Sequence, residues 1–415
     1  MKKIYYLVLT VLSIAVLSWV LPWLYNLCLP VRQPDPFVSY PPVNDKFIVS
    51  MPSDDRKGER EIFEADPFTG EKGSTYTWEE RDSLLPEVFI GQLSAKGQMP
   101  DSIKGVEITM QVIRRNSWVF SSNPRDLNRS VPTVYPLMES LPVRFKFEDP
   151  EVVMTLDDGL KIINIESNDI DETKTKRFAK MFDEKGFTFP AKEAIANITT
   201  RKGYDNGYLI IDWADNLYHL KMQANRPSMA KIELPDSVIP QHVFIMENVD
   251  RMLYGLISDK KNNLYAIAHD DDYTISKLPG IKFDPETEKM AIVKGLFSWN
   301  VKLSKDDDVK WVALNSDDYS VLGVYDFHHD TPVSRIIEGW IFPFTTYFTT
   351  NNDLHVYPRV GNFSWNAFLL NFVLAVLVFF VAKGKNIKCT IGKSVVTLIF
   401  GIFAFIPLII LKRAH

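Results

Sequence analysis

The run His328-His329-Asp330 has the residue types of a metal site. Imidazole nitrogen and carboxylate oxygen are both good ligands for zinc and related ions. Two adjacent histidines on a strand, however, point to opposite faces of the sheet and do not converge on one ion. We therefore interpret this run as a polar turn, and we expect neither a metal site nor a cofactor.

Two acidic runs have the charge to attract calcium, His269-Asp270-Asp271-Asp272 and Asp306-Asp307-Asp308. Neither has the alternating carboxylates and the glycine of a calcium-binding loop. Asp is also common where a chain reverses direction, because its side chain hydrogen-bonds to nearby backbone amides. The sequence therefore favours solvated hairpin tips at both places.

Familiar catalytic motifs are missing from the chain. There is no G-x-S-x-G elbow and no H-E-x-x-H pair. Gly392-Lys393-Ser394 looks like the end of a phosphate-binding loop, but it lacks the glycine five positions earlier and opens an apolar segment. The 52 acidic residues leave open a glycan hydrolase or lyase that uses two carboxylates about 5–10 Å apart. No catalytic residue can be named, and we favour a protein that is not an enzyme.

The elements that would position any site repeat along the chain. Leu209-Ile210-x-Asp212-x-x-x-Asn216-Leu217-Tyr218 recurs, six positions identical, as Leu256-Ile257-x-Asp259-x-x-x-Asn263-Leu264-Tyr265. Looser copies occur at Met154–Leu160, Trp311–Val321 and Thr349–Leu354. Each copy reads as an apolar strand, a turn of Asp, Asn or Gly, and a second apolar strand.

Repeats of 40–50 residues with several strands each are typical of propeller blades. We therefore expect a mainly β fold, with a propeller-like repeat domain of about five hairpin units over residues 144–362. An open β-sandwich or two stacked sheets is the alternative. Asp171 to Gly186 interrupts the first unit with Phe178, Met181 and Phe182 at helical spacing. It predicts a short helix or long loop that either binds a partner or only packs those apolar side chains.

Two smaller segments precede the repeats. Residues 30–75 contain five prolines within their first 13 positions and then turn polar, which predicts an extended spacer. Residues 76–143 predict a small α+β region. In it, Thr77 and Glu80 have the spacing of a helix capping box, and a strand is expected from Val106 to Ile113.

Three uncharged apolar stretches flank these regions, Ile4–Leu29, Trp365–Ala382 and Ser394–Leu411. Crossing a bilayer takes about 20 helical residues, so each is long enough or nearly so. We expect a transmembrane anchor over residues 1–29, uncleaved rather than a signal peptide, and a transmembrane hairpin over residues 363–415. Lysines concentrate before the first stretch and between the last two, which predicts that the large middle region lies outside the cytoplasm.

Charge and cysteine content agree with this arrangement. The chain has 47 basic and 52 acidic residues, and the two membrane parts hold eight of the basic residues and none of the acidic ones. The middle region is therefore acidic, which speaks against nucleic-acid binding. Both cysteines, Cys28 and Cys389, belong to the membrane parts. A cysteine-free outer domain suits a bacterial periplasm and excludes a thiol nucleophile there.

Three segments of the chain carry a resemblance to a protein family. They are Tyr76–Pro86 (YTWEERDSLLP), Met99–Gly105 (MPDSIKG) and Tyr135–Ser140 (YPLMES). Together they resemble an uncharacterised family of membrane-anchored proteins from Bacteroides-like bacteria, and the likeness covers nearly the whole chain. The resemblance implies a cell-envelope protein, and relatives encoded beside ABC-type transporter genes suggest such a transporter as a partner. It carries over no catalytic residue.

From these observations we expect a multi-pass protein of the bacterial inner membrane with its large domain in the periplasm. The domain would bind a ligand or serve as an accessory to an ABC-type transporter complex. An envelope glycan hydrolase or lyase is the first alternative. A ligand sensor is the second, although no cytoplasmic output domain accompanies it.

Overall fold

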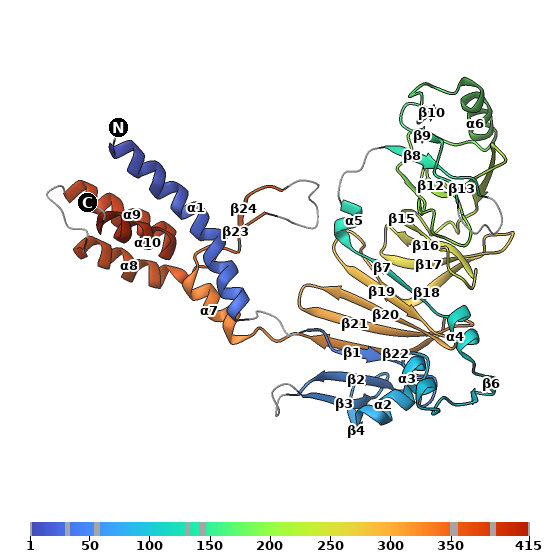
Figure 1. Ribbon diagram of the computed structural model, residues 1–415, viewed down its shortest axis with the longest axis horizontal. Helices are drawn as coiled ribbons and strands as arrows, with labels where there is room; N and C mark the ends of the chain where they lie inside the picture. Colours follow the sequence, from blue (N-terminus) through green and yellow to red (C-terminus); the bar gives the residue numbers. More distant parts are fainter. Residues whose placement is uncertain are drawn as a thin grey trace. The chain divides into compact units, whose positions relative to one another are not determined.

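The computed structural model describes residues 2–29, 34–53, 59–128, 133–140, 147–348, 356–381 and 387–413. The chain divides into two compact units (Figure 1). We call Asp35–Phe327 the β unit. We call Met1–Pro34 together with His328–His415 the helical unit.

The β unit contains five larger sheets among the residues described, largely of antiparallel strands. Sheet 1 consists of β1 (Phe37–Ser39), β2 (Phe47–Pro52), β3 (Arg60–Ala65) and β4 (Lys72–Thr75). Sheet 2 consists of β8 (Val134–Leu137), β9 (Val152–Thr155) and β10 (Lys161–Asn164). Sheet 3 consists of β11 (Glu193–Ile195), β12 (Tyr208–Ile211), β13 (Leu217–Gln223) and β14 (Arg226–Ile232). Sheet 4 consists of β15 (Pro240–Ile245), β16 (Leu253–Asp259), β17 (Asn263–Ala268) and β18 (Ile275–Lys282). Sheet 5 consists of β7 (Trp118–Ser122), β19 (Lys289–Lys294), β20 (Ser298–Lys305), β21 (Asp308–Asn315) and β22 (Val321–His328).

Smaller elements complete the β unit. They are α2 (Trp78–Leu84), α3 (Ile90–Ala95), β5 (Ser102–Ile103), β6 (Val106–Glu107), α4 (Met110–Asn116), α5 (Pro124–Asn128) and α6 (Glu172–Glu184).

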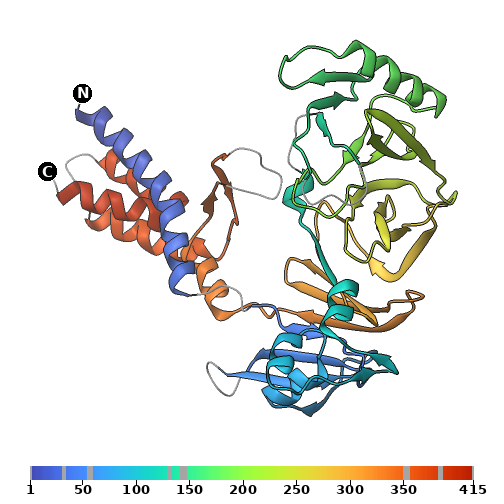
Figure 2. The same ribbon diagram turned by 45° about the vertical axis from the view of Figure 1, so that its right-hand side comes forward.

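Shared hydrophobic cores give the order in which the sheets pack. Sheet 1 packs on sheet 5, sheet 5 on sheet 4, sheet 4 on sheet 3, and sheet 3 on sheet 2 (Figures 1 and 2). Among the described residues, no core joins sheet 1 to sheet 2. The β unit is therefore an open row of blade-like sheets rather than a closed ring.

Inner strands carry apolar residues on both faces because a sheet covers each face. On β12, Leu209 and Ile211 enter the core shared with sheet 4, whereas Tyr208 and Ile210 enter the core shared with sheet 2. Successive side chains of a strand point to opposite faces, so every residue of β12 is buried. Alternate side chains of β21 divide in the same way between sheets 1 and 4.

The strongest sequence repeat corresponds to structurally equivalent hairpins. Leu209 of β12 and Leu256 of β16 both face the next sheet of the row, sheets 4 and 5 respectively. Ile210 and Ile257 both face the preceding sheet. The repeat therefore encodes one blade-like sheet that buries both faces.

The Asp–Asn pair of the repeat holds the turn. The carboxylate of Asp212 accepts hydrogen bonds from the backbone amide and side-chain amide of Asn216, at 2.8 and 3.0 Å. Asp259 accepts the same two bonds from Asn263, both at 2.8 Å. Burial raises the pKa of Asp259, but these hydrogen bonds hold that pKa below its usual range.

The structure confirms a mainly β fold and departs from the expected boundaries. Part of the expected spacer forms the strands β1 to β4 of sheet 1, because its apolar strand residues pack against sheet 5. The hairpin copy expected at Thr349–Leu354 lies outside the described residues. The described residues do not form the expected closed propeller. The strands β1 to β4 bring the number of larger sheets to five.

The small α+β region partly follows its prediction. Thr77 and Glu80 form the capping box of α2, with the carboxylate of Glu80 accepting from the Thr77 amide at 2.8 Å. The strand expected over residues 106–113 is wrong beyond Glu107. Thr109 caps a helix there, since its side chain accepts from the Val112 amide at 3.2 Å.

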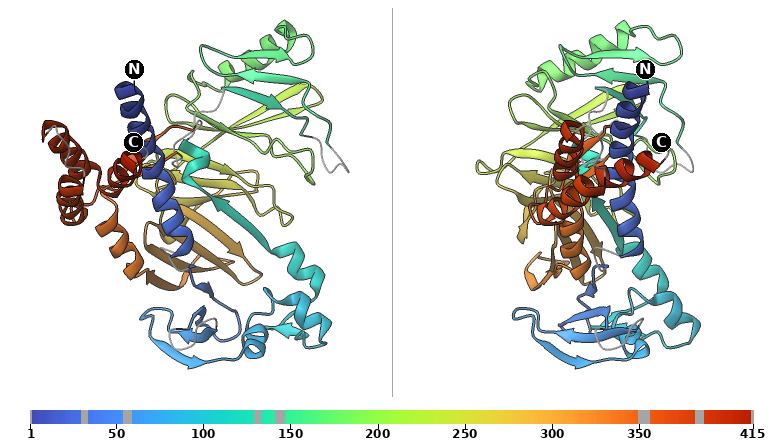
Figure 3. Two further views of the ribbon diagram at one scale, coloured as in Figure 1. Left: turned by 60° about the vertical axis from the view of Figure 1, so that its left-hand side comes forward. Right: turned by 90° about the vertical axis from the view of Figure 1, so that its left-hand side faces the viewer.

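The helical unit consists of five helices and two short strands among the described residues (Figure 3). They are α1 (Lys2–Cys28), α7 (Val333–Ile341), β23 (Thr345–Tyr347), β24 (Arg359–Gly361), α8 (Ala367–Val381), α9 (Ile387–Phe400) and α10 (Ile402–Arg413).

The three expected membrane spans reduce to one. Within the described residues, α1 alone is long and apolar enough to cross a bilayer, and its place near the N-terminus also fits a signal sequence. The second stretch forms a 15-residue helix, α8. The third is broken at Gly401, whose φ of +56° ends α9. A Cβ at Gly401 would lie 2.1 Å from the side-chain oxygen of Asn371, so the break is built into the packing.

Candidate functional site

A polar and aromatic cluster lies along the side of sheets 3 and 4 where several strands begin or end, not along an outermost strand. We call it the edge cluster. Its members are Lys202, Asp205, His219, Lys221, Glu247, Tyr254, His269 and Tyr273. They come from the segment before β12, from β13, from the segment after β15, from β16 and from the turn between β17 and β18. Antiparallel pairing brings the end of one strand beside the start of the next, so these side chains meet although the sequence separates them.

A buried charged trio forms the floor of the edge cluster. Lys202 Nζ lies 3.0 Å from a carboxylate oxygen of Glu247 and also pairs with Asp205. The three side chains are 4%, 3% and 2% exposed, respectively. The trio holds two carboxylates against one ammonium, so backbone and side-chain amides must supply the remaining stabilisation.

Those amides come from the same segment. Glu247 accepts hydrogen bonds from the Asn206 backbone amide at 2.7 Å and from the Asn197 side chain at 2.9 Å. Burial raises the pKa of Glu247, and the bonds from Asn206 and Lys202 partly offset this rise. Asp205 accepts from the Gly207 amide at 3.0 Å and from the hydroxyl of Ser140.

His219 is a neutral imidazole with a defined tautomer. Burial, with the nearby charge of Lys221, lowers the pKa of His219 to about 3. Its Nε2 lies 2.5 Å from the carbonyl oxygen of Asn206, which only accepts, so Nε2 carries the proton. Nδ1 then accepts from the hydroxyl of Tyr273 at 2.8 Å. Burial raises the pKa of Tyr273 to about 12, so this hydroxyl keeps its proton.

A stack of half-buried rings covers the floor. Tyr254 lies between His269 and Tyr273, with ring centroids 4.1 and 4.9 Å away and interplanar angles of 23° and 29°. His219 approaches the same tyrosine at 4.7 Å. Burial lowers the pKa of His269, so the stack is uncharged near neutral pH.

One cation, Lys221, lies against the ring stack. A second, Arg251, lies near it, because its charge adds to burial in lowering the pKa of His269. Lys221 Nζ lies 5.2 Å from the centroid of Tyr254, and the guanidinium of Arg251 lies 4.4 Å from that of Tyr204. Burial lowers the pKa of Lys221, partly offset by Asp205 and Glu247. Within the described part of the chain, the Lys221 ammonium has no hydrogen-bond or ion-pair partner. It is therefore available to an anionic group that reaches the rings.

The carboxylates of the edge cluster are poorly suited to glycosidase chemistry. Asp205 and Glu247 are buried, and each is already bound by Lys202 and by amides. A catalytic acid and base must reach the substrate. The arrangement instead offers two cations and a stack of ring faces, which are groups for binding.

The residue runs considered as sites from the sequence lie at different places in the structure. In the structure, His269 joins the ring stack, while Asp270 accepts from the Thr274 amide at 3.0 Å and shapes the β17–β18 turn. Asp306, with φ of +50°, lies in the β20–β21 hairpin turn. His328 ends β22 and His329 is buried. In the described ranges, no three metal-ligating side chains gather at one point.

The insertion at residues 171–186 forms α6. Asp171 caps it, since its side chain accepts from the Lys174 amide at 2.9 Å, and Gly186 follows it with φ of +70°. Phe178 and Phe182 are fully buried in the core of sheets 2 and 3. The helix therefore packs its apolar side chains as its spacing predicted.

The members of the edge cluster other than His269 were missed from sequence. Lys202, Lys221 and Glu247 belong to no motif, and their neighbours in the chain are ordinary strand and loop residues. The repeat was the one sequence signal that could have indicated the cluster. It makes sheets 3 and 4 equivalent, and so it places the C-terminal end of β13 and the N-terminal end of β16 on the same side of neighbouring sheets.

Comparison with known proteins adds a family and no activity. No curated protein sequence matches the chain significantly. Among solved structures, the chain is similar to the WD40 domain of SCAP from fission yeast, at 9% identity over 78% of each chain with a TM-score of 0.27. It is also similar to BBS1N in complex with ARL6DN, at 10% identity over 72% of this chain and 93% of that chain with a TM-score of 0.23. TM-scores this low do not establish a fold shared with either structure. Residues 37–314 match the family described as a domain of unknown function, DUF4857, and the chain therefore belongs to that family.

Proposed function

We propose that this protein is a membrane-anchored, extracytoplasmic binding protein whose edge cluster takes an anionic ligand with a flat ring face. The observation that carries the proposal is the unpartnered Lys221 ammonium, in the described part of the chain, beside the half-buried rings of Tyr254 and Tyr273. An acidic saccharide has both required features. Its carboxylate pairs with Lys221 and Arg251, and the apolar face of its ring packs on the tyrosines by dispersion.

Saccharide binding is tested on the full chain in lipid nanodiscs. Matched neutral and uronic-acid oligosaccharides are titrated while tryptophan fluorescence is followed. We expect the acidic series to bind and Lys221→Gln to weaken binding about tenfold or more, because a hydrogen bond to a charged group is lost. Lys277→Gln, which removes an exposed lysine from β18 of the neighbouring sheet 4, is the matched control and should bind as the wild type does. No acidic binding, or equal affinity in the Lys221 variant, refutes the proposal.

Incubation with the same oligosaccharides, followed by analysis of the products, addresses the enzymatic alternative. Product formation that a Glu247→Gln variant loses would favour a hydrolase or lyase over a binding protein. We expect no turnover, because Lys202 and amides occupy both buried carboxylates of the edge cluster.

We place α1 across the inner membrane as an uncleaved anchor, with the β unit in the periplasm. Lys2 and Lys3 before this helix support the orientation. The short apolar helices α8, α9 and α10 belong to the same compact unit, and we place them in the membrane beside α1.

Cysteine labelling tests this orientation. A single Lys277→Cys is introduced into a chain in which Cys28 and Cys389 are replaced by Ser. We expect a membrane-impermeant maleimide to label it in spheroplasts. Labelling only after lysis would place the β unit in the cytoplasm and overturn the assignment.

An ABC-type transporter is the partner we propose for the helical unit, on the basis of the family resemblance of the chain. The full chain purified from its native membrane in mild detergent should carry transporter subunits. Their absence under conditions that keep other envelope complexes intact would remove this part of the proposal.

A further inference from the structure

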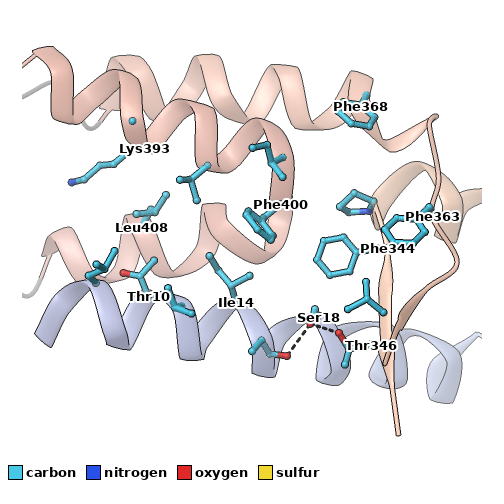
Figure 4. Close-up of a pocket in the computed structure, with 18 of the residues that line it drawn as sticks. Thr10, Ile14, Ser18, Phe344, Thr346, Phe363, Phe368, Lys393, Phe400 and Leu408 are labelled. Carbon is cyan, nitrogen blue, oxygen red and sulfur yellow. Dashed lines mark hydrogen bonds between the residues drawn. The ribbon is translucent and has the colours of Figure 1, made fainter. Parts of the chain in front are cut away.

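The helical unit contains a large apolar cavity that is open on part of its boundary. Its volume is about 1580 Å³, and it lies between α1, the β23–β24 pair and the helices α8 to α10 (Figure 4). Ile14, Phe344, Val396 and Phe400 contribute to its walls. The cavity lies wholly within this one compact unit.

Three hydroxyls on the cavity wall, those of Thr10, Ser18 and Thr346, are hydrogen-bonded within the protein. The hydroxyls of Ser18 and Thr346 lie 2.7 Å apart, and Ser18 also lies 2.8 Å from the carbonyl oxygen of Ala15. The hydroxyl of Thr10 donates to the carbonyl of Tyr6 at 2.8 Å. Nothing along the middle of the cavity calls for a polar ligand, so an apolar occupant fits it best.

Charge is confined to one end. Lys393 is the charged residue among those that line the cavity, and Figure 4 shows it at the same end as Thr10 and Leu408, away from Phe363. The ammonium has no hydrogen-bond or ion-pair partner in the described part of the chain. The membrane parts of the sequence hold eight basic residues and no acidic one, so nothing on them opposes an anion.

The length of the lining suits a lipid of one leaflet. On α1 the lining runs from Tyr6 to Ser18. At 1.5 Å per residue this is roughly 18 Å. Half of a hydrocarbon core about 30 Å thick is about 15 Å. An acyl chain whose head group lies beside Lys393 therefore ends near the middle of the bilayer.

We propose that this cavity binds one anionic phospholipid of the cytoplasmic leaflet. Its acyl chains lie along Ile14 and Phe400, and its phosphate pairs with Lys393. The charge at one end and the apolar walls match the two ends of such a molecule. The proposal rests on the proposed placement of α1 and α8 to α10 in the membrane, but the site is separate from the edge cluster and does not depend on the proposed saccharide binding.

Gly392 offers a way to fill the cavity without disturbing the fold. It lines the cavity on α9, and a Cβ built there meets no atom within 4 Å. Replacement of glycine by leucine in a helix also favours the helical backbone. Gly392→Leu thus places a side chain where the lipid would lie. Val395→Phe on the same helix, at a position outside the lining, is the matched control for added bulk.

The experiment measures lipid retained by the full chain. The protein is transferred to nanodiscs of phosphatidylcholine and phosphatidylglycerol, four to one, with identical acyl chains, then released and weighed by native mass spectrometry. We expect one phosphatidylglycerol per chain. Lys393→Gln should reduce this occupancy about fivefold, since one lysine near a membrane surface contributes about that factor. Lys388→Gln removes a charge from the same helix outside the lining and should change it less.

Gly392→Leu should abolish retention, while Val395→Phe keeps it. Circular dichroism confirms that each variant remains helical. Equal retention of the two lipids, or full retention in Gly392→Leu, would show surface lipid only and overturn the proposal. A wild-type dimer that Gly392→Leu dissociates would show a second copy of the chain in the cavity and overturn it equally.

Discussion

Replacement of Lys202 by Met tests the role of the ammonium in the buried charged trio. Lys202, Asp205 and Glu247 are each at most 4% exposed, so removal of the ammonium leaves two carboxylates without their cation. Breaking a buried pair in this way costs about 3–5 kcal/mol. One carboxyl can take up a proton instead. From an ordinary pKa of about 4.3, that protonation costs about 3.7 kcal/mol at pH 7. We therefore expect a loss of about 3–4 kcal/mol in the free energy of unfolding.

The stability of this variant should depend on pH. In the variant, the pKa of Glu247 rises further above its unfolded value, because burial already raises it and Lys202 no longer lowers it. The folded state then binds more protons than the unfolded state near neutral pH, so stability increases as the pH falls. Between pH 7 and pH 5 the cost of protonation falls by about 2.7 kcal/mol. Most of the defect should disappear over this range.

The assay is urea unfolding of the full chain in detergent at pH 7 and pH 5, followed by tryptophan fluorescence. Trp118, Trp299 and Trp311 are buried in the β unit and report on it. Lys192→Met is the matched control. The side chains of Lys192 and Asp215 are 33% and 27% exposed, and Lys260 remains 2.9 Å from Asp215.

We expect the control to lose at most about 1 kcal/mol. Glu247→Gln added to Lys202→Met should recover much of the loss at pH 7, since it removes one of the two uncompensated charges. A Lys202→Met variant that loses no more than the control, or loses equally at both pH values, would refute this role of the ammonium.

Three further predictions concern the sheets. Asp259→Ala should cost about 2–4 kcal/mol by urea unfolding, because it orphans the Asn263 amides and the Tyr265 hydroxyl that bond the buried carboxylate. A loss below about 1 kcal/mol would contradict the role of Asp259 in holding the turn. Burial is the largest single effect on the pKa of His242 and lowers it, but Glu193 at 3.1 Å and Glu286 at 3.5 Å together outweigh burial, so the net pKa is raised. Its contribution is therefore complete below about pH 6.5 and is lost as the pH rises through the raised value. The wild type should exceed His242→Gln by on the order of 1 kcal/mol at pH 6 and by less at pH 8.5, measured as unfolding midpoints, whereas an equal gap at both would refute the assignment. Phe182→Ala should cost about 3–5 kcal/mol, measured as a loss of thermal and urea stability, and a neutral result would mean that α6 is not part of the core.

Local signals in the sequence were sufficient where neighbouring residues decide the structure. The apolar run after Lys3 predicted α1, and the Thr77–Glu80 spacing predicted the cap of α2. The Asp–Asn pairs of the repeat predicted the hairpins of sheets 3 and 4, because a carboxylate bonded to amides four residues away is a local device.

Contacts between distant segments decided the rest. The strands β1 to β4 lie in a stretch that is polar enough to resemble a spacer, and they form sheet 1 only because sheet 5 covers their apolar face. The third apolar stretch has the composition of a span, yet packing of Asn371 against Gly401 breaks it into α9 and α10.

The sequence by itself determined the apolar N-terminal helix, the repeated hairpin and its turns, and the acidic, cysteine-free character of the region between the apolar flanks. The tertiary structure alone decided the open row of sheets, the edge cluster and the cavity beside α1. The physical reason is the separation along the chain of the residues that interact. The periodic spacing of apolar residues and the hydrogen bonds of turns involve residues a few positions apart. Lys202 meets Glu247, and Ile14 and Phe400 join one core, only after separate strands and helices have packed.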